Sequence, residues 1–77
     1  MTLDTVRIAA GLSQREFGER IGVTHSGYIS QLCNGTRTLP RPLAIKVWRE
    51  FGAKVGPIAE LSDADVETLA RIEGVPA

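Results

Sequence analysis

The residues that decide the fold are 13–26, which read SQREFGERIGVTHS. Ser13 and Glu16 have the spacing of a capping box, in which each side chain bonds the backbone amide of the other, so a helix is expected to begin after Ser13. Phe17 and Ile21 stand four residues apart and share one face of that helix. Gly22 is the residue type that most easily adopts the left-handed conformation that ends a helix. This stretch predicts a short amphipathic helix followed by a tight turn.

A second short helix is expected directly after the turn. Ile29 and Leu32 supply an inward-facing pair, Thr24 or Ser26 can act as the N-cap, and Gly35 can end the helix. Gly18, on the first helix, has no side chain at the place where two helices joined by a short turn must touch. The pattern therefore indicates a helix-turn-helix.

Three further helices are expected outside this pair. One lies between Thr2 and Gly11, one follows the Pro40-Arg41-Pro42 start signal and ends at Gly52, and one lies between Ser62, capped with Asp65, and Gly74. The helix before Gly52 is expected to form the main core with Leu43, Ala44, Val47, Trp48 and Phe51. The predicted fold class is a small five-helix all-α domain with a central helix-turn-helix.

Length and composition exclude several classes of protein. The chain has 77 residues, of which 43% are hydrophobic and 23% charged, so one core is expected. No apolar run reaches the roughly 18 residues that span a bilayer, and the start lacks the features of a secretory signal, so a cytoplasmic location is expected. One cysteine and one histidine cannot form a structural zinc site, and neither a metal, a cofactor nor a small-molecule ligand is expected.

Charge is distributed unevenly along the chain. The formal net charge is zero, but residues 1–56 carry eight Lys and Arg against four Asp and Glu, whereas residues 57–77 carry one Arg against five acids. The chain thus combines a segment of net charge +4 with a segment of net charge −4. We interpret residues 1–56 as a DNA-binding domain and 57–77 as a C-terminal helix that projects away from DNA.

Four motifs occur in order and together resemble a known family. They are Gly11-Leu12-Ser13-Gln14, Ile21-Gly22-Val23-Thr24, Tyr28-Ile29-Ser30-Gln31-Leu32 and Asn34-Gly35-Thr36-Arg37. The likeness runs from about Leu3 to Gly52 and is to the lambda-repressor-like DNA-binding domain of phage repressors and Cro proteins. It implies that the third helix enters the major groove of double-stranded DNA and that two protomers read a near-palindromic operator.

The resemblance also implies roles for individual residues. Gln14 matches a glutamine that touches a phosphate and braces the recognition helix, Asn34 matches an asparagine after that helix, and Arg41 matches an arginine that meets the backbone. Gln31 can bond bidentately to adenine, and the serines can use either hydrogen-bond polarity. The expected phosphate contacts are Gln14, Arg15, Asn34, Thr36, Arg37 and Arg41. The expected base-facing residues are Thr24, His25, Ser26, Gly27, Tyr28, Ser30 and Gln31.

One departure from the family affects the start of the third helix. Members commonly have one residue fewer between the turn glycine and the closing Asn-Gly, so an extra residue lies near Ser26-Gly27. If Gly27 lengthens the turn, the helix begins near Ser26, and Tyr28, Ser30 and Gln31 dominate the contacts. If the helix begins at Thr24 instead, Gly27 lies within it at a cost of roughly 1 kcal/mol. Both alternatives stay open on the sequence.

The C-terminal segment has more apolar residues than one short helix needs. Its stripe either covers the core of the monomer or makes a two-fold contact, and a shared role is favoured. The residues expected at the dimer contact are Val66, Leu69 and Ile72.

The leading hypothesis is a Cro-type transcriptional repressor that acts as a homodimer. The alternatives are an antitoxin-like prophage regulator whose C-terminal helix binds a protein partner, and an interaction module that has lost DNA binding. An enzyme is not expected, because there is one histidine, no nucleophile paired with it and no glycine-rich phosphate loop.

Overall fold

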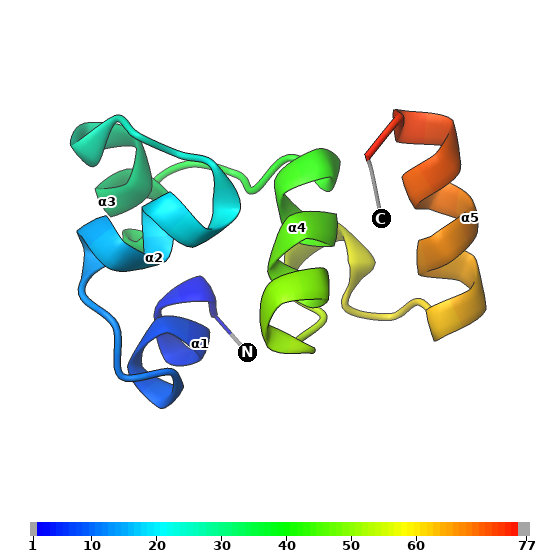
Figure 1. Ribbon diagram of the computed structural model, residues 1–77, viewed down its shortest axis with the longest axis horizontal. Helices are drawn as coiled ribbons and strands as arrows, with labels where there is room; N and C mark the ends of the chain where they lie inside the picture. Colours follow the sequence, from blue (N-terminus) through cyan, green and yellow to red (C-terminus); the bar gives the residue numbers. More distant parts are fainter. Residues whose placement is uncertain (1, 76–77) are drawn as a thin grey trace. The chain divides into compact units, whose positions relative to one another are not determined.

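The computed structural model describes residues 2–75, and this part of the chain contains five α-helices, one short 3-10 helix and no strand (Figure 1). The elements in order are α1 (Leu3–Ala9), α2 (Gln14–Ile21), α3 (Ser26–Asn34), α4 (Arg41–Phe51), η1 (Gly56–Ile58) and α5 (Asp63–Glu73). The all-α, five-helix class predicted from the sequence is confirmed. None of these helices is long and apolar enough to cross a membrane.

The chain divides into two compact units, one ending at Thr38 and one beginning at Leu39. The N-terminal unit contains α1, α2 and α3, and the C-terminal unit contains α4, η1 and α5. The boundary that we expect from the sequence, at residue 56, is of a different kind. It separates the residues expected to bind DNA from the C-terminal helix, and it does not mark where two compact units meet. That division stays a prediction.

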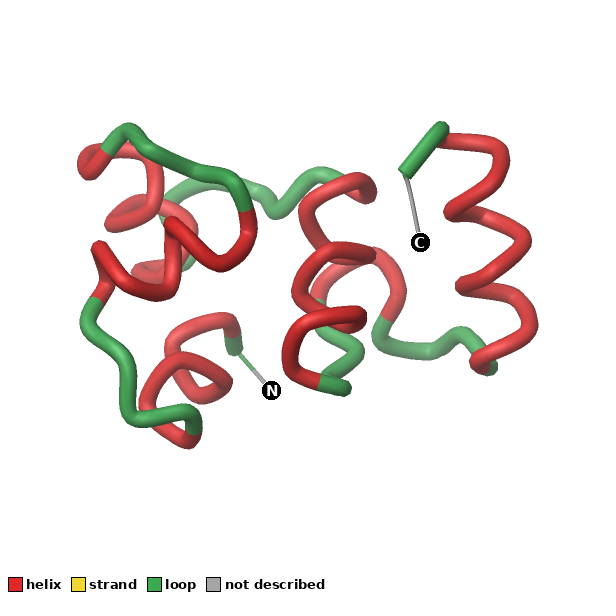
Figure 2. The backbone as a smooth tube through the Cα atoms, in the orientation of Figure 1, coloured by secondary structure: helices red, strands yellow, loops and turns green. Residues whose placement is uncertain are grey.

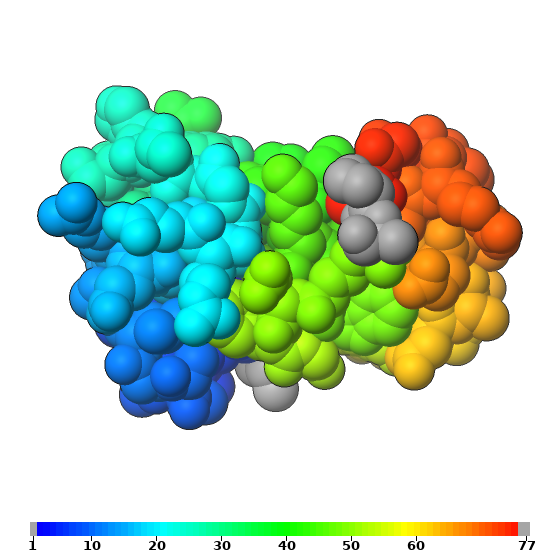
Figure 3. Space-filling model, viewed as in Figure 1, coloured from blue at the N-terminus to red at the C-terminus, as the bar shows by residue number. Residues whose placement is uncertain are grey.

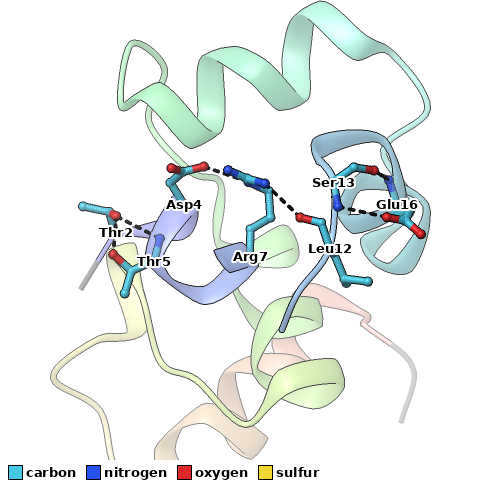
Figure 4. Close-up of polar contacts among 7 residues, drawn as sticks. All are labelled: Thr2, Asp4, Thr5, Arg7, Leu12, Ser13 and Glu16. Carbon is cyan, nitrogen blue, oxygen red and sulfur yellow. Dashed lines mark hydrogen bonds and ion pairs between the residues drawn. The ribbon is translucent and has the colours of Figure 1, made fainter. Parts of the chain in front are cut away.

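In the N-terminal unit, α1 is held to the loop that follows it by one arginine. Thr2 caps the helix by accepting a hydrogen bond from the Thr5 amide at 3.2 Å. Arg7 donates to the Asp4 carboxylate at 2.8 Å and, with another nitrogen, to the Leu12 carbonyl at 2.8 Å (Figure 4). Because Leu12 directly precedes the cap of α2, Arg7 connects α1 to the start of the helix-turn-helix.

The predicted capping box at the start of α2 is confirmed. The Ser13 hydroxyl accepts from the Glu16 amide at 3.1 Å, and a Glu16 carboxylate oxygen accepts from the Ser13 amide at 3.0 Å (Figure 4). Hydrogen bonding to the Glu16 carboxylate, first from the Ser13 backbone amide and then from the Ser13 side chain, lowers the pKa of this carboxyl, since it favours the charged form. Gly22 ends the helix with a φ of 80°, as the sequence predicts.

The packing of the turn between α2 and α3 against α2 depends on Gly18. A Cβ atom placed on Gly18 would lie 2.6 Å from the Val23 carbonyl oxygen and 3.5 Å from Cγ1 of Ile29. The Val23 amide also donates to the Gly18 carbonyl at 2.8 Å, which fixes the turn against the helix. The tube view shows that this turn, residues 22–25, leads directly into α3 (Figure 2). Glycine is therefore required here by a close approach of backbone to backbone.

Apolar residues from all three helices form the core of the N-terminal unit. Phe17, Ile21 and Ile29 are almost completely buried, with exposed fractions of 2% or less. Other residues buried in the same unit are Leu3, Val6, Val23, Leu32 and Cys33. Ala10, which shares a helical face with Leu3 and Val6 in the sequence, is exposed because α1 ends before it.

The C-terminal unit has its own core. Its fully buried cluster contains Ala44, Ile45, Ile58, Val66 and Ala70. Two details differ from the core face expected for this helix. Ile45, which was not expected in the core, is fully buried. Leu43, Trp48 and Phe51, which were expected there, are only half-buried. Ser62 caps α5 by accepting from the Asp65 amide at 3.2 Å, which is the half of the predicted capping box that the structure shows.

Ion pairs join α4 and the loop after it to α5. Arg41 contacts Glu73 at 2.9 Å, and Arg49 contacts Glu67 at 3.4 Å. Lys54 pairs with Asp63. The acidic segment counted along the sequence therefore does not stand apart from the basic one, because three of its carboxylates neutralise cations of the same unit.

Replacing Gly18 with alanine is expected to destabilise the protein by about 1 to 3 kcal/mol, because the new methyl group meets a backbone oxygen that cannot move without opening the turn. Within a helix, alanine is otherwise more favourable than glycine by about 1 kcal/mol. At a site without this contact, the substitution would therefore stabilise the protein. Urea unfolding of both proteins measures the difference. A Gly18→Ala variant more stable than the wild type would contradict the close crossing.

The capping box also predicts a pH dependence. Because the pKa of Glu16 is lowered in the folded protein, its charged form contributes stability above the ordinary glutamate pKa of about 4.3, and this contribution is lost as the pH falls through the lowered value. Glu16→Gln keeps an oxygen acceptor but does not titrate. The wild type should be the more stable protein at neutral pH, and urea unfolding at a series of pH values should show this advantage shrinking under acid conditions. A constant difference would contradict this origin.

Candidate nucleic-acid interface

The third helix presents a polar surface, and its start combines the two alternatives left open by the sequence. It begins at Ser26, which is the start expected if Gly27 lengthened the turn. Gly27 is the second residue of the helix rather than part of the turn. Ile29, Leu32 and Cys33 are buried, which fixes one face of α3 in the N-terminal unit.

The side chains predicted to face bases all lie on the accessible side of this region. Tyr28 and Ser30 are half-buried, whereas the remaining members are exposed: Thr24, His25, Ser26, Gly27 and Gln31. In the space-filling view, the cyan and teal colours of α2, the turn and α3 form much of the visible surface of this unit (Figure 3). The structure thus brings the predicted base-facing residues together on one turn and one helix.

The N-cap of α3 is His25, not Thr24 or Ser26 as expected. The Nδ1 atom of His25 accepts a hydrogen bond from the Tyr28 amide at 3.2 Å. The prediction was wrong because serine and threonine are the usual capping residues, whereas here the turn places the imidazole of His25 at the position that serves the third amide of the helix. His25 therefore has a structural role that its residue type alone did not indicate.

The capping geometry explains Gly27. A Cβ atom at Gly27 would lie 3.1 Å from Cε1 and 3.4 Å from Nδ1 of the His25 ring. A larger residue would push on the ring whose nitrogen holds the cap, so the glycine and the histidine form a matched pair. Because Nδ1 accepts, the proton of the neutral ring is on Nε2, and this N–H donor is carried at the exposed start of α3.

A second group of interactions fixes the other end of the exposed face. Gln31 accepts a hydrogen bond through Oε1 from Nε of Arg37 at 2.7 Å. The guanidinium of Arg37 also lies over the ring of Tyr28, 5.6 Å from its centroid. The amides of Thr36 and Arg37 donate to the Gln31 carbonyl at 3.0 and 3.3 Å, which folds the loop after α3 back onto the helix.

The residues predicted to touch phosphate are spread over both units. Gln14 is the half-buried first residue of α2, and the side chain of Arg15 is 88% exposed and contacts Glu19 at 3.3 Å. Asn34, Thr36 and Arg37 are exposed at the end of α3 and in the loop after it. Arg41 is the first residue of α4, in the C-terminal unit, and contacts Glu73 at 2.9 Å.

A hollow lies where the end of α2 and the start of α3 meet. Its volume is about 450 Å³, and its lining residues are Arg15, Glu19, Val23, Thr24, Ser26 and Ile29. Its lining combines the ion pair of Arg15 and Glu19, two hydroxyl side chains and two apolar residues. It belongs to the same exposed region as the predicted contacts.

The three residues expected at a dimer contact have different surroundings. Val66 is fully buried in the core of the C-terminal unit, and Leu69 is half-buried against that core. Ile72 is 76% exposed. Of this set, only Ile72 is mostly exposed to solvent, and the dimer contact itself stays a prediction.

The remaining candidate groups for chemistry are few. Cys33 is buried behind α3, and burial raises the pKa of its thiol. Within residues 2–75, no cluster of three or more His, Cys, Asp or Glu could hold a metal ion.

The whole chain, residues 1–77, matches the family model described as a helix-turn-helix domain. No curated protein and no solved structure matches the chain. The match confirms the helix-turn-helix that the sequence predicts, while the narrower resemblance to phage repressors and Cro proteins stays a prediction.

The pairing of His25 and Gly27 predicts that their substitutions are coupled. Gly27→Ala should destabilise the wild type, because the methyl group displaces the ring that caps α3. In a His25→Ser background, a smaller cap leaves room for the methyl group, and Gly27→Ala should then be neutral or stabilising. Thermal unfolding of the four proteins should give a coupling energy of about 1 kcal/mol or more. Additive effects would contradict the pairing.

Proposed function

This chain belongs to the helix-turn-helix domain family, and we propose that it is a cytoplasmic, sequence-specific regulator of transcription that binds double-stranded DNA. The major groove of DNA admits an α-helix and presents a distinct pattern of donors and acceptors at each base pair. In this proposal α3 lies in the groove and α2 lies above the phosphate backbone.

The observation that carries the proposal is the two-sided character of α3. Its apolar side is anchored by Ile29, Leu32 and Cys33, while its other side presents hydroxyl, amide and imidazole groups to solvent. These are groups that hydrogen-bond to base edges.

The charges support modest phosphate binding rather than a strongly basic surface. Arg41, Arg49 and Lys54 all pair with acids of α5, so much of the excess counted over residues 1–56 is neutralised within the C-terminal unit. Each phosphate that the protein neutralises contributes a slope of about −0.9 to the dependence of log affinity on log salt concentration. We therefore propose a regulator whose preference for its operator depends largely on contacts to bases.

The form of the regulator that we propose is a Cro-type repressor that binds a near-palindromic operator as a homodimer. Residues 1–56 serve DNA binding and residues 57–77 serve the core and the dimer contact. The exposed Ile72 supports a protein contact on α5. If its partner is a different protein instead of a second copy, the alternative is an antitoxin-like regulator.

Selection of bound sequences from a random duplex pool, followed by titration of the enriched duplexes against salt, tests this proposal. An enriched inverted repeat with half-sites about one helical turn apart is expected, since a two-fold dimer reads such sites. Failure to enrich any sequence, with no affinity for duplex DNA at low salt, would contradict DNA recognition. An enriched single site without a repeat would contradict the homodimer alone.

The pairing of Arg41 with Glu73 gives a further prediction. If Arg41 contacts phosphate, its carboxylate partner competes with DNA, so Glu73→Gln should tighten binding by about twofold to fivefold. Glu67→Gln is the matched control, because it removes the same charge from α5 but releases Arg49 instead. Fluorescence titrations with the selected duplex measure both. Equal effects of the two substitutions would show that only net charge matters and that Arg41 has no phosphate contact.

A further inference from the structure

We infer that Gln31 and Arg37 act as one base-reading unit that selects guanine in the major groove. This inference rests on the proposed function, because it requires α3 to lie in that groove. It also changes two assignments made from the sequence, in which Arg37 touches phosphate and Gln31 pairs with adenine.

Arg37 is held beside α3 although it belongs to the loop. Its Nε atom donates to Gln31 at 2.7 Å, its guanidinium covers the Tyr28 ring at 5.6 Å, and its backbone amide donates to the Gln31 carbonyl at 3.3 Å. The backbone bond fixes the position of the residue, and the two side-chain contacts, with Gln31 and Tyr28, restrict the rotamers of the long side chain. A loop arginine with no such contacts is free to follow the phosphate backbone, whereas this one is fixed at the level of the helix surface.

The bond to Arg37 also determines which groups Gln31 presents. Bidentate recognition of adenine requires the amide oxygen to accept from the base N6 and the amide nitrogen to donate to N7. Here Arg37 occupies one lone pair of that oxygen and places its own donors beside it. The amide therefore offers its NH₂ donors to the base. With adenine, the N6 donor of the base would face the donors of Arg37 and Gln31 and find no acceptor.

Donors from both side chains match guanine. An arginine has five N–H donors, so four remain on the two terminal nitrogens of Arg37 after Nε bonds Gln31. Guanine presents two acceptors, N7 and O6, at its major-groove edge, and a planar guanidinium binds both at once. Gln31 serves as the positioning residue that aims the guanidinium, and Tyr28 supports its flat face.

The test compares selection from a random duplex pool by the wild type, Arg37→Ala and Arg15→Ala. The wild type should enrich a guanine at one position of each half-site, and replacing it by adenine should weaken binding by about fivefold to a hundredfold. Arg37→Ala should lose that preference and accept adenine there, because the Gln31 oxygen is released. Arg15→Ala is the matched control, a loss of one exposed cation of α2 in the same unit, and should weaken binding to all sequences without changing the preferred base.

The outcomes separate this inference from the proposed function. In one outcome, the wild type enriches an operator in which no guanine preference is lost on replacing Arg37. That result would overturn the inference and leave the proposed function standing. So would an Arg37→Ala variant that binds every sequence more weakly by the same factor, since that is the behaviour of a phosphate contact. No enrichment and no duplex binding by the wild type would overturn both. Circular dichroism of the variants checks that each retains its helices.

Discussion

The contact between the backbone of Gly18 and the Val23 carbonyl is the constraint on which the N-terminal unit depends. A Cβ atom on residue 18 would lie 2.6 Å from that oxygen, so the turn can pack against α2 only where α2 carries a glycine, and the Val23 amide then bonds the Gly18 carbonyl. This close approach fixes where the turn leaves α2, and residues 23–25 then lead to the start of α3 at Ser26. The buried Phe17, Ile21 and Ile29 make the same crossing favourable by removing apolar surface from water.

The exposed face of α3 is organised before any partner binds. At one end, the His25 ring caps the helix and lies close to Gly27. At the other end, Gln31 and Tyr28 hold Arg37 against the helix. Side chains that are already ordered lose less conformational entropy on binding, so these contacts favour recognition by a small surface. The same contacts determine which donors and acceptors the helix can present, and the capping histidine leaves an N–H donor at its start.

The features that could be predicted from the sequence are those that depend on residues close together along the chain. The capping box of Ser13 and Glu16, the end of α2 at Gly22 and the burial of Phe17 follow from spacings within one helical turn. The cap of α3 was misplaced because His25 is an unusual capping residue and acts together with the glycine beside it. The bond between Gln31 and Arg37 and the ion pair between Arg41 and Glu73 join residues whose proximity depends on how the chain folds back. Burial of Ile45 likewise depends on what surrounds α4, which no helical period specifies.

The central claim is that α3 and the turn before it form the surface that meets DNA. It is tested most directly by titrating isotope-labelled protein with the selected duplex and following the backbone amide resonances. The largest shifts are expected for the amides of residues 24–31 and of the loop that carries Arg37, with small changes along the solvent-facing side of α5. Shifts centred on α5, with those of α3 unchanged at saturation, would contradict the account.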